Sequence, residues 1–144
     1  MEWIPTAVTA LMFAWTAGVA HEFADHIAGQ TDKMAANKAK PGWLGWSHII
    51  QHVLAYHAVM VVMLIIVVAV FNLPITFLGF IAAILFSAIT HGFIDRRWPV
   101  RWLLQKTGSA NFAEMQTPVC GMYQSDQSLH KLALWVSAGL FALL

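Results

Sequence analysis

The chain has 144 residues, of which 59% are hydrophobic and only 10% are charged, whereas about 25% of an average soluble domain is charged. This composition excludes a disordered chain and is unlike that of a soluble globule. The net charge of +1 is too small for a nucleic-acid-binding surface. The single cysteine, Cys120, excludes an internal disulfide and a cysteine-based zinc motif. The composition therefore predicts a small integral membrane protein, with lipids as partners and without a nucleic-acid partner.

Hydropathy divides the chain into four apolar segments. The 54 residues from Pro41 to Ile94 contain no Asp, Glu, Lys or Arg, which is too long for one span of about 20 residues. The sequence Asn72-Leu73-Pro74 provides a turn that separates two spans. The sequence thus predicts one all-α membrane domain over residues 1–144, with spans at about 3–20, 52–71, 75–94 and 129–144.

The basic residues predict the orientation of these spans. All eight lie between spans 1 and 2 or between span 3 and the first turns of span 4: Lys33, Lys38, Lys40, Arg96, Arg97, Arg101, Lys106 and Lys131. By the positive-inside rule both loops are cytoplasmic, so both termini lie outside the inner membrane. We therefore expect a four-helix bundle with two basic cytoplasmic loops.

The second basic loop contains two distinct segments. Residues 96–106 mix tryptophan and aliphatic residues with basic ones, which is typical of a short amphipathic helix in the interface. The alternative is a span end whose long basic side chains extend to the membrane surface. Residues 108–122 are expected to form an irregular loop.

The polar residues of the spans are spaced as helical pairs. Three histidines lie four residues from an aspartate, in the pairs His21–Asp25, His91–Asp95 and Asp126–His130. This spacing places both side chains on one face of a helix. The remaining histidine of interest, His52, begins span 2. In the predicted orientation, all four groups lie at the cytoplasmic end of the bundle.

These groups form a candidate metal site. Helical bundles build such sites from inward-facing pairs of this kind, and the predicted ligands are His21, Asp25, His52, His91, Asp95, Asp126 and His130. Imidazole and carboxylate ligands favour zinc, with manganese and iron as alternatives, and their number suits one or two divalent ions. Catalytic roles are predicted for Asp25, Asp95 and Asp126. The alternative is a metal-free polar network that joins the helices.

Other polar residues near this group are weaker candidates. His48, four residues before His52, is a secondary candidate for a ligand, and so is His26, which lies five residues from His21 and off its face. His57 lies off the face of His52 and is predicted to be a hydrogen-bonded core residue. Glu22 is expected to face solvent, with a role as general base as the alternative. Tyr56 lies one turn beyond His52, where its hydroxyl could donate to an anionic substrate.

Several motifs resemble those of a family of small, uncharacterised multi-helix membrane proteins of actinobacteria, their phages and mobile elements. The resemblance rests on residues 21–26, 30–32, 35–38, 52–56, 90–97, 106–108 and 126–130. That family is similar to proteins labelled membrane-bound metal-dependent hydrolases. The resemblance implies a multi-helix membrane protein in which these histidines and aspartates form a site, and it supplies no established reaction.

Two functions are consistent with the sequence. The first is a membrane-embedded, metal-dependent hydrolase that acts on a lipid or amphiphilic phosphate or ester at the inner leaflet. Arg96, Arg97 and Lys131 would hold the anionic headgroup, with Lys38 as a further candidate. The second is a non-enzymatic phage or mobile-element membrane factor for exclusion, lysis or structure, in which a metal or polar cluster joins the helices. In either case the chain is a candidate for homo-oligomerisation.

Overall fold

The computed structural model describes residues 3–144, and this part of the chain is all-helical. The elements in chain order are α1 (Trp3–Phe23), the π-helix η1 (Ala24–Ala28), α2 (Asp32–Asn37), α3 (Gly42–Phe71), α4 (Phe77–Ile94), α5 (Trp98–Lys106), α6 (Ala110–Glu114) and α7 (Gly121–Leu143).

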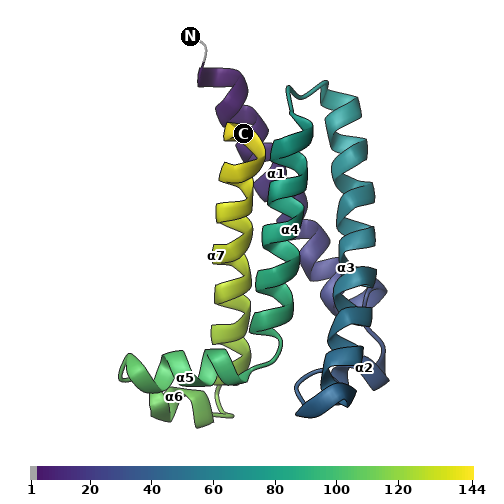
Figure 1. The fold of residues 1–144 in the computed structure, drawn as a ribbon. Helices are drawn as coiled ribbons and strands as arrows, with labels where there is room; N and C mark the ends of the chain where they lie inside the picture. The colour runs from purple at the N-terminus through teal and green to yellow at the C-terminus, as the bar shows by residue number, and fades with distance from the viewer. Residues whose placement is uncertain (1–2) are drawn as a thin grey trace.

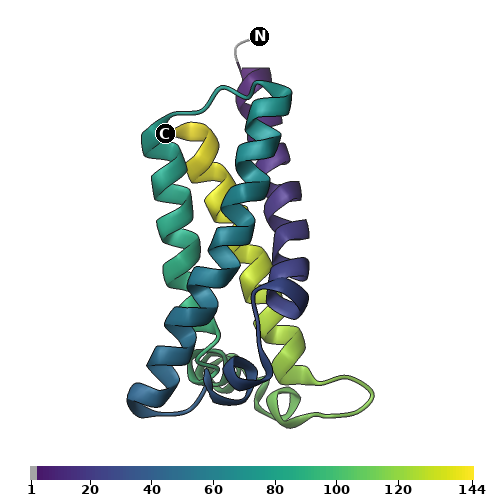
Figure 2. The ribbon, with the colours of Figure 1, turned by 90° about the vertical axis from the view of Figure 1, so that its right-hand side faces the viewer.

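The four long helices α1, α3, α4 and α7 run side by side, as Figures 1 and 2 show. Helix α7 packs against α1 and α4, and α3 packs against the same two helices from the other side. The short helices α2, α5 and α6 lie at the end opposite the C-terminus of α7 (Figure 1). The predicted basic loops are therefore gathered at one end of the molecule.

Within residues 3–144, three helical segments are long and apolar enough to cross a membrane: Trp3–Ala28, Gly42–Phe71 and Phe77–Ile94. Helix α7 contains the predicted fourth span but is not among them, because its first turns carry polar and charged side chains. Large apolar side chains along the helices are exposed, including those of Trp15, Leu54, Ile89 and Trp135. Such continuous exposed apolar surface is typical of contact with lipid.

The helix boundaries confirm the predicted turn and revise other predictions. Asn72 adopts a left-handed conformation (φ 47°) and ends α3 where the turn was predicted. Helix α3 begins at Gly42, ten residues before the predicted start of span 2. The earlier start is possible because no proline interrupts residues 42–71. Hydropathy therefore located the apolar span and not the whole helix.

The prediction of an irregular loop over residues 108–122 is partly wrong, because this segment contains α6 and the beginning of α7. Residues 98–106 form the predicted short helix, α5, which begins with a proline in its first turn. Val100 of α5 is fully buried and packs with Ala113 of α6 and Met122 of α7. These contacts hold the connection between α4 and α7 in a compact arrangement.

The interior between the long helices is apolar towards the termini. Phe13 of α1 and Phe141 of α7 stack with their ring centroids 4.6 Å apart. Around them, small buried residues such as Ala17, Ala83 and Ala138 let the helices approach closely. This packing fixes the helices at one end and leaves the polar side chains to meet at the other.

Candidate metal centre

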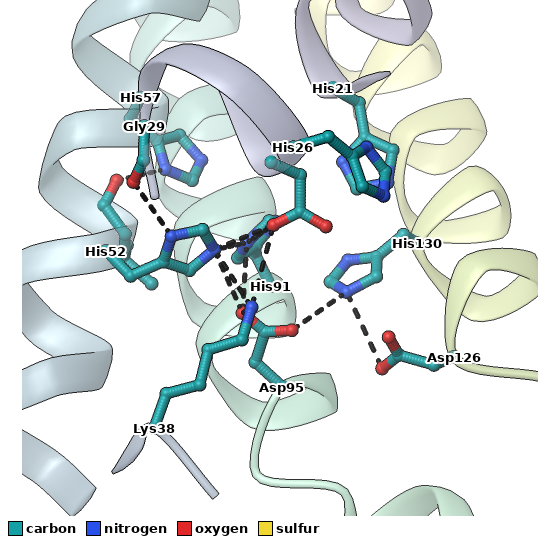
Figure 3. A network of polar contacts seen from close by, with 12 residues as sticks. His21, His26, Gly29, Lys38, His52, His57, His91, Asp95, Asp126 and His130 are labelled. Atoms are coloured by element: carbon teal, nitrogen blue, oxygen red, sulfur yellow. Dashed lines mark hydrogen bonds and ion pairs between the residues drawn. The ribbon is translucent and has the colours of Figure 1, made fainter. Parts of the chain in front are cut away.

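The structure brings all seven predicted site residues together at the end where α2 and α5 lie. None of the seven is more than 5% exposed. Their nitrogen and oxygen atoms form three overlapping groups, in each of which the candidate ligand atoms lie within 4.8 Å of one another. The groups are His21–His91–His130, Asp25–His52–His91–Asp95 and Asp95–Asp126–His130. Figure 3 shows that the side chains labelled His52, His91, Asp95 and His130 lie around a common centre.

The end of α1 positions Asp25. The helix continues as the π-helix η1, and local π geometry of this kind is frequent at functional sites. Gly29 then carries the chain close to α3. A Cβ atom at Gly29 would lie 2.7 Å from the carbonyl oxygen of Ala24 and 3.1 Å from the backbone of Tyr56. Only glycine allows this approach, which places the Gly29 carbonyl against His52.

His52 is oriented by that carbonyl group. Its Nδ1 lies 3.0 Å from the carbonyl oxygen of Gly29, which accepts the hydrogen bond. This leaves Nε2 directed into the cluster. There it lies 2.8 Å from Asp25 Oδ1 and 3.0 Å from His91 Nε2. A hydrogen bond from the second ring nitrogen to a carbonyl is the usual way in which a metal-binding histidine is oriented.

Lys38 enters the cluster from the segment after α2. Its Nζ donates to Asp95 Oδ2 at 2.8 Å, lies 3.7 Å from Asp25 Oδ1 and is 3.3 Å from His52 Nε2. Lys38 was a further candidate for holding an anionic headgroup; its side chain is 8% exposed and paired with carboxylates. Figure 3 shows its ammonium group between His52 and Asp95.

Arg96 supports Lys38 from outside the cluster. The guanidinium group of Arg96 is buried and donates through Nη1 to the carbonyl oxygen of Lys38 at 2.7 Å. It also lies over the ring of Trp46, 5.0 Å from the ring centroid. Gly45 makes room for it, because a Cβ there would collide with Arg96 Nη1. Arg96 is thus engaged with the protein, whereas Arg97 and Lys131 are exposed.

Asp95 lies at the centre of the contacts. Its Oδ2 faces Lys38, His52 and His91, and its Oδ1 lies 3.5 Å from His130 Nε2. Burial alone would raise the pKa of the Asp95 carboxyl, but the neighbouring imidazoles of His130, His52 and His91 hold it well below its ordinary value. The carboxylate is consequently charged and available to a cation on either side.

Asp126 has a different environment, although it is equally buried. Burial raises the pKa of its carboxyl to about 6. Its Oδ1 and the Nε2 atom of His130 are both buried and have no hydrogen-bond partner. Buried polar atoms are nearly always partnered in proteins. This part of the cluster therefore has ligand atoms without a hydrogen-bond partner, and Asp25 Oδ1 is a further such atom.

Gln127 is a site residue that the sequence analysis missed. Its Oε1 accepts from His21 Nε2 at 3.1 Å, and its Nε2 lies 3.5 Å from Asp25 Oδ2. Gln127 thereby connects α7 to the end of α1. Its position next to Asp126 was the available signal, but adjacent residues of a helix usually point in different directions. Tyr56 also belongs here: its fully buried hydroxyl has no partner, and its ring lies 4.1 Å from that of His91.

The other predicted polar residues lie outside the ligand groups. His57 donates to the carbonyl of Val53 and contacts Ser87 Oγ at 3.1 Å, as predicted for a core residue. His48 is buried but contacts the carbonyl of Leu44, not the cluster. His26 is exposed and lies 2.9 Å from the hydroxyl of Tyr123. Glu22 is exposed, as expected, and faces Lys131.

No family model, curated protein or solved structure matches this chain. The motif resemblance therefore stays an expectation, and the chemistry of the cluster is argued from its own residues.

Proposed function

We propose that the protein is a membrane-embedded metal-binding protein whose four long helices form a bundle. Both termini would lie outside, with the cluster at the cytoplasmic end of the inner membrane. The distribution of charge supports this orientation, because the exposed Lys and Arg residues belong to the connections at that end, apart from Lys131 in α7. Trp43, Trp46, Trp98 and Trp102 are exposed in the same region, as expected of an interfacial aromatic belt.

The observation that carries the proposal is the convergence of Asp25, His52, His91 and Asp95. Asp25 lies in η1, His52 in α3 and His91 in α4, and Asp95 directly follows α4. All four residues are buried, and they offer ligand atoms within 4.8 Å of one another. Three aspartates are buried in the cluster, together with the single ammonium group of Lys38. Buried charges need a partner or a metal ion. We infer a divalent cation here, and the ligand types favour zinc over manganese or iron.

The chemistry best supported by this centre is metal-dependent hydrolysis. A bound divalent ion would polarise the substrate and provide a nucleophile at neutral pH. One of the carboxylates of Asp25, Asp95 and Asp126 would accept the proton that the attacking water loses. The substrate would be a lipid or another amphiphile with a phosphate or ester group. Arg97 and Lys131, which are exposed near the cluster, would attract its anionic headgroup.

The first experiment is elemental analysis of the full chain purified in detergent without chelator. The proposal predicts bound zinc, manganese or iron, and loss of that metal in His91→Ala. His26→Ala is the matched control, since this exposed histidine lies outside the ligand groups. Folded wild-type protein without metal would contradict the proposal. Metal-loaded protein is then tested on phosphatidic acid and on a carboxylic ester in mixed micelles, where wild type should hydrolyse one of them and His91→Ala neither.

A second function is favoured by the contacts of Lys38. Its ammonium group already pairs with Asp95 and Asp25, so the cluster could serve as an ionic network that joins the helices of a structural membrane factor. That function predicts metal-free protein whose thermal unfolding does not change with chelator or added zinc. A metal centre predicts unfolding at higher temperature when zinc is present, because a ligand bound only by the native state stabilises it.

A further inference from the structure

Asp95 faces two different groups of atoms with its two oxygens. Oδ2 contacts Lys38 at 2.8 Å and His52 at 3.1 Å. Oδ1 points the other way, toward His130 Nε2 at 3.5 Å, as Figure 3 shows. Beyond His130 lies Asp126, whose Oδ1 is 3.8 Å from the same nitrogen. The carboxylate of Asp95 therefore separates a side that contains the ammonium group from a side that contains Asp126 and His130.

The distances on the second side are those of metal ligands and not of hydrogen bonds. N–H···O hydrogen bonds measure about 2.7–3.2 Å, and the contacts of 3.5 and 3.8 Å at His130 are longer. Ligands about 2.1 Å from a tetrahedral ion lie roughly 3.4 Å apart. The two contacts of His130 are thus spaced as they would be around one ion, and all three residues offer ligand atoms within 4.8 Å of one another. On the first side the corresponding contacts range from 2.8 to 3.8 Å.

The lack of hydrogen-bond partners at His130 and Asp126 agrees with the spacing of metal ligands. His130 Nε2 and Asp126 Oδ1 are buried without a hydrogen-bond partner, in side chains that are 2% and 5% exposed. Lys38 is not among the contacts of either atom. Burying a carboxylate without a partner is costly, so a cation at this position would remove a cost that the folded chain otherwise carries.

We propose that a second divalent cation binds to Asp95, Asp126 and His130, with Asp95 bridging it to the ion at Asp25, His52 and His91. This inference rests on the proposed function and deepens it. Three protein ligands leave a coordination position open, as in catalytic sites. Centres with two neighbouring ions stabilise both the attacking and the leaving oxygen of a phosphoryl group. The substrate class is accordingly a phosphate ester, in preference to a carboxylic ester.

The test is a titration of the chelator-treated full chain in detergent with Mn²⁺, followed by elemental analysis and electron paramagnetic resonance. Wild type should bind two ions per chain and give the exchange-coupled spectrum of a bridged pair. Asp126→Asn, which keeps the shape of the side chain, should bind one ion and give the spectrum of an isolated Mn²⁺. His48→Gln is the matched control, because the hydrogen bonds of this buried histidine stay within α3, and it should behave as wild type.

The outcomes separate this inference from the proposed function. One uncoupled ion in wild type, retained in Asp126→Asn, would overturn the second site and leave the metal centre intact. No bound ion in folded wild type would overturn both. The coupled spectrum of wild type supports the bridge without any variant, so a failure of Asp126→Asn to fold does not decide the result. Two coupled ions in Asp126→Asn would show that Asp126 is not a ligand.

Discussion

The two ends of the long helices are held together by different kinds of contact. Toward the termini, Phe13, Phe141 and small residues such as Ala83 pack without a polar partner. At the other end, aspartates, histidines and Lys38 meet in a buried network in which each atom depends on specific neighbours. Apolar contacts depend on volume and tolerate exchange, whereas a buried charge is destabilising once its partner is removed. The polar end should therefore be the sensitive one.

The largest effect is expected for Asp95→Ala. This substitution removes the carboxylate shared by Lys38, His52, His91 and His130, and it leaves the ammonium group buried without its closest partner. Breaking a buried pair costs about 3–5 kcal/mol. Thermal unfolding in detergent should occur at a much lower temperature, and elemental analysis should find no bound metal.

Glu114→Gln is the control for Asp95→Ala, because Glu114 pairs with Arg101 on the exposed surface and such pairs contribute at most about 1 kcal/mol. Equal destabilisation by the two substitutions would contradict the contrast between the buried cluster and the surface.

Gly29→Ala should have the next largest effect. The added methyl group would meet the backbone of Ala24 and of α3, so the connection after η1 has to shift. We expect a loss of about 1–3 kcal/mol, as for other overpacked positions. Metal binding should weaken as well, because the Gly29 carbonyl that orients His52 moves. Chelator competition measures the second effect.

Gly18→Ala, within α1, has the opposite expectation. No atom lies within 4 Å of a Cβ built there, and alanine favours a helix over glycine by about 1 kcal/mol. The melting temperature of Gly18→Ala should be equal to that of wild type or higher. If Gly18→Ala lost as much stability as Gly29→Ala, the close approach of Gly29 to α3 would not be the cause of the destabilisation in Gly29→Ala.

Lys38→Met tests whether Lys38 strengthens or weakens zinc binding. An ammonium group 3.3 Å from His52 Nε2 and 2.8 Å from Asp95 Oδ2 competes with a metal ion for the same ligands. Its removal should tighten zinc binding roughly 10-fold, or about 1.4 kcal/mol, and should destabilise the metal-free protein. Weaker zinc binding in Lys38→Met would instead make Lys38 part of the binding-competent arrangement. Lys40→Met, at an exposed position, serves as control.

The smallest effect is expected at the apolar end. Phe141→Leu reduces the contact with Phe13 and Phe80 but keeps an apolar side chain, so we expect a loss of roughly 1–1.5 kcal/mol. Metal content by elemental analysis should equal that of wild type. A loss of metal in this variant would show that the two ends are coupled through the helices, and that they are not independent regions.

Much of the candidate site could be predicted from spacing. His91 and Asp95 lie four residues apart in one helix, and helical geometry places such residues on one face wherever the helix lies. The same holds for Asp126 and His130. Hydropathy then located the apolar segments, and their order placed the polar pairs at one end of the molecule. These are local properties, which a sequence expresses directly.

The contacts of the connecting segments could not be predicted in this way. Lys38 was predicted as one of the basic residues of the loop between spans 1 and 2, but the chain after α2 turns its side chain into the cluster, where Asp95 stabilises the charge. Likewise, Gly29 gave no sign that its carbonyl would orient His52, since these residues are 23 positions apart. Helix α6 was missed because the residues after Gly108 show no clear apolar period.

By itself, the sequence determined that the chain is apolar and helical and that histidine–aspartate pairs share helix faces, because composition and a four-residue spacing act within single elements. Only the tertiary structure decided which atoms of those pairs meet. Asp95 faces Lys38 with one oxygen and His130 with the other, and Asp126 lies beside His130 without a hydrogen-bond partner for its Oδ1. Such contacts depend on how α2, α4 and α7 pack, because groups distant in the sequence interact only when packing brings them within a few ångströms of each other.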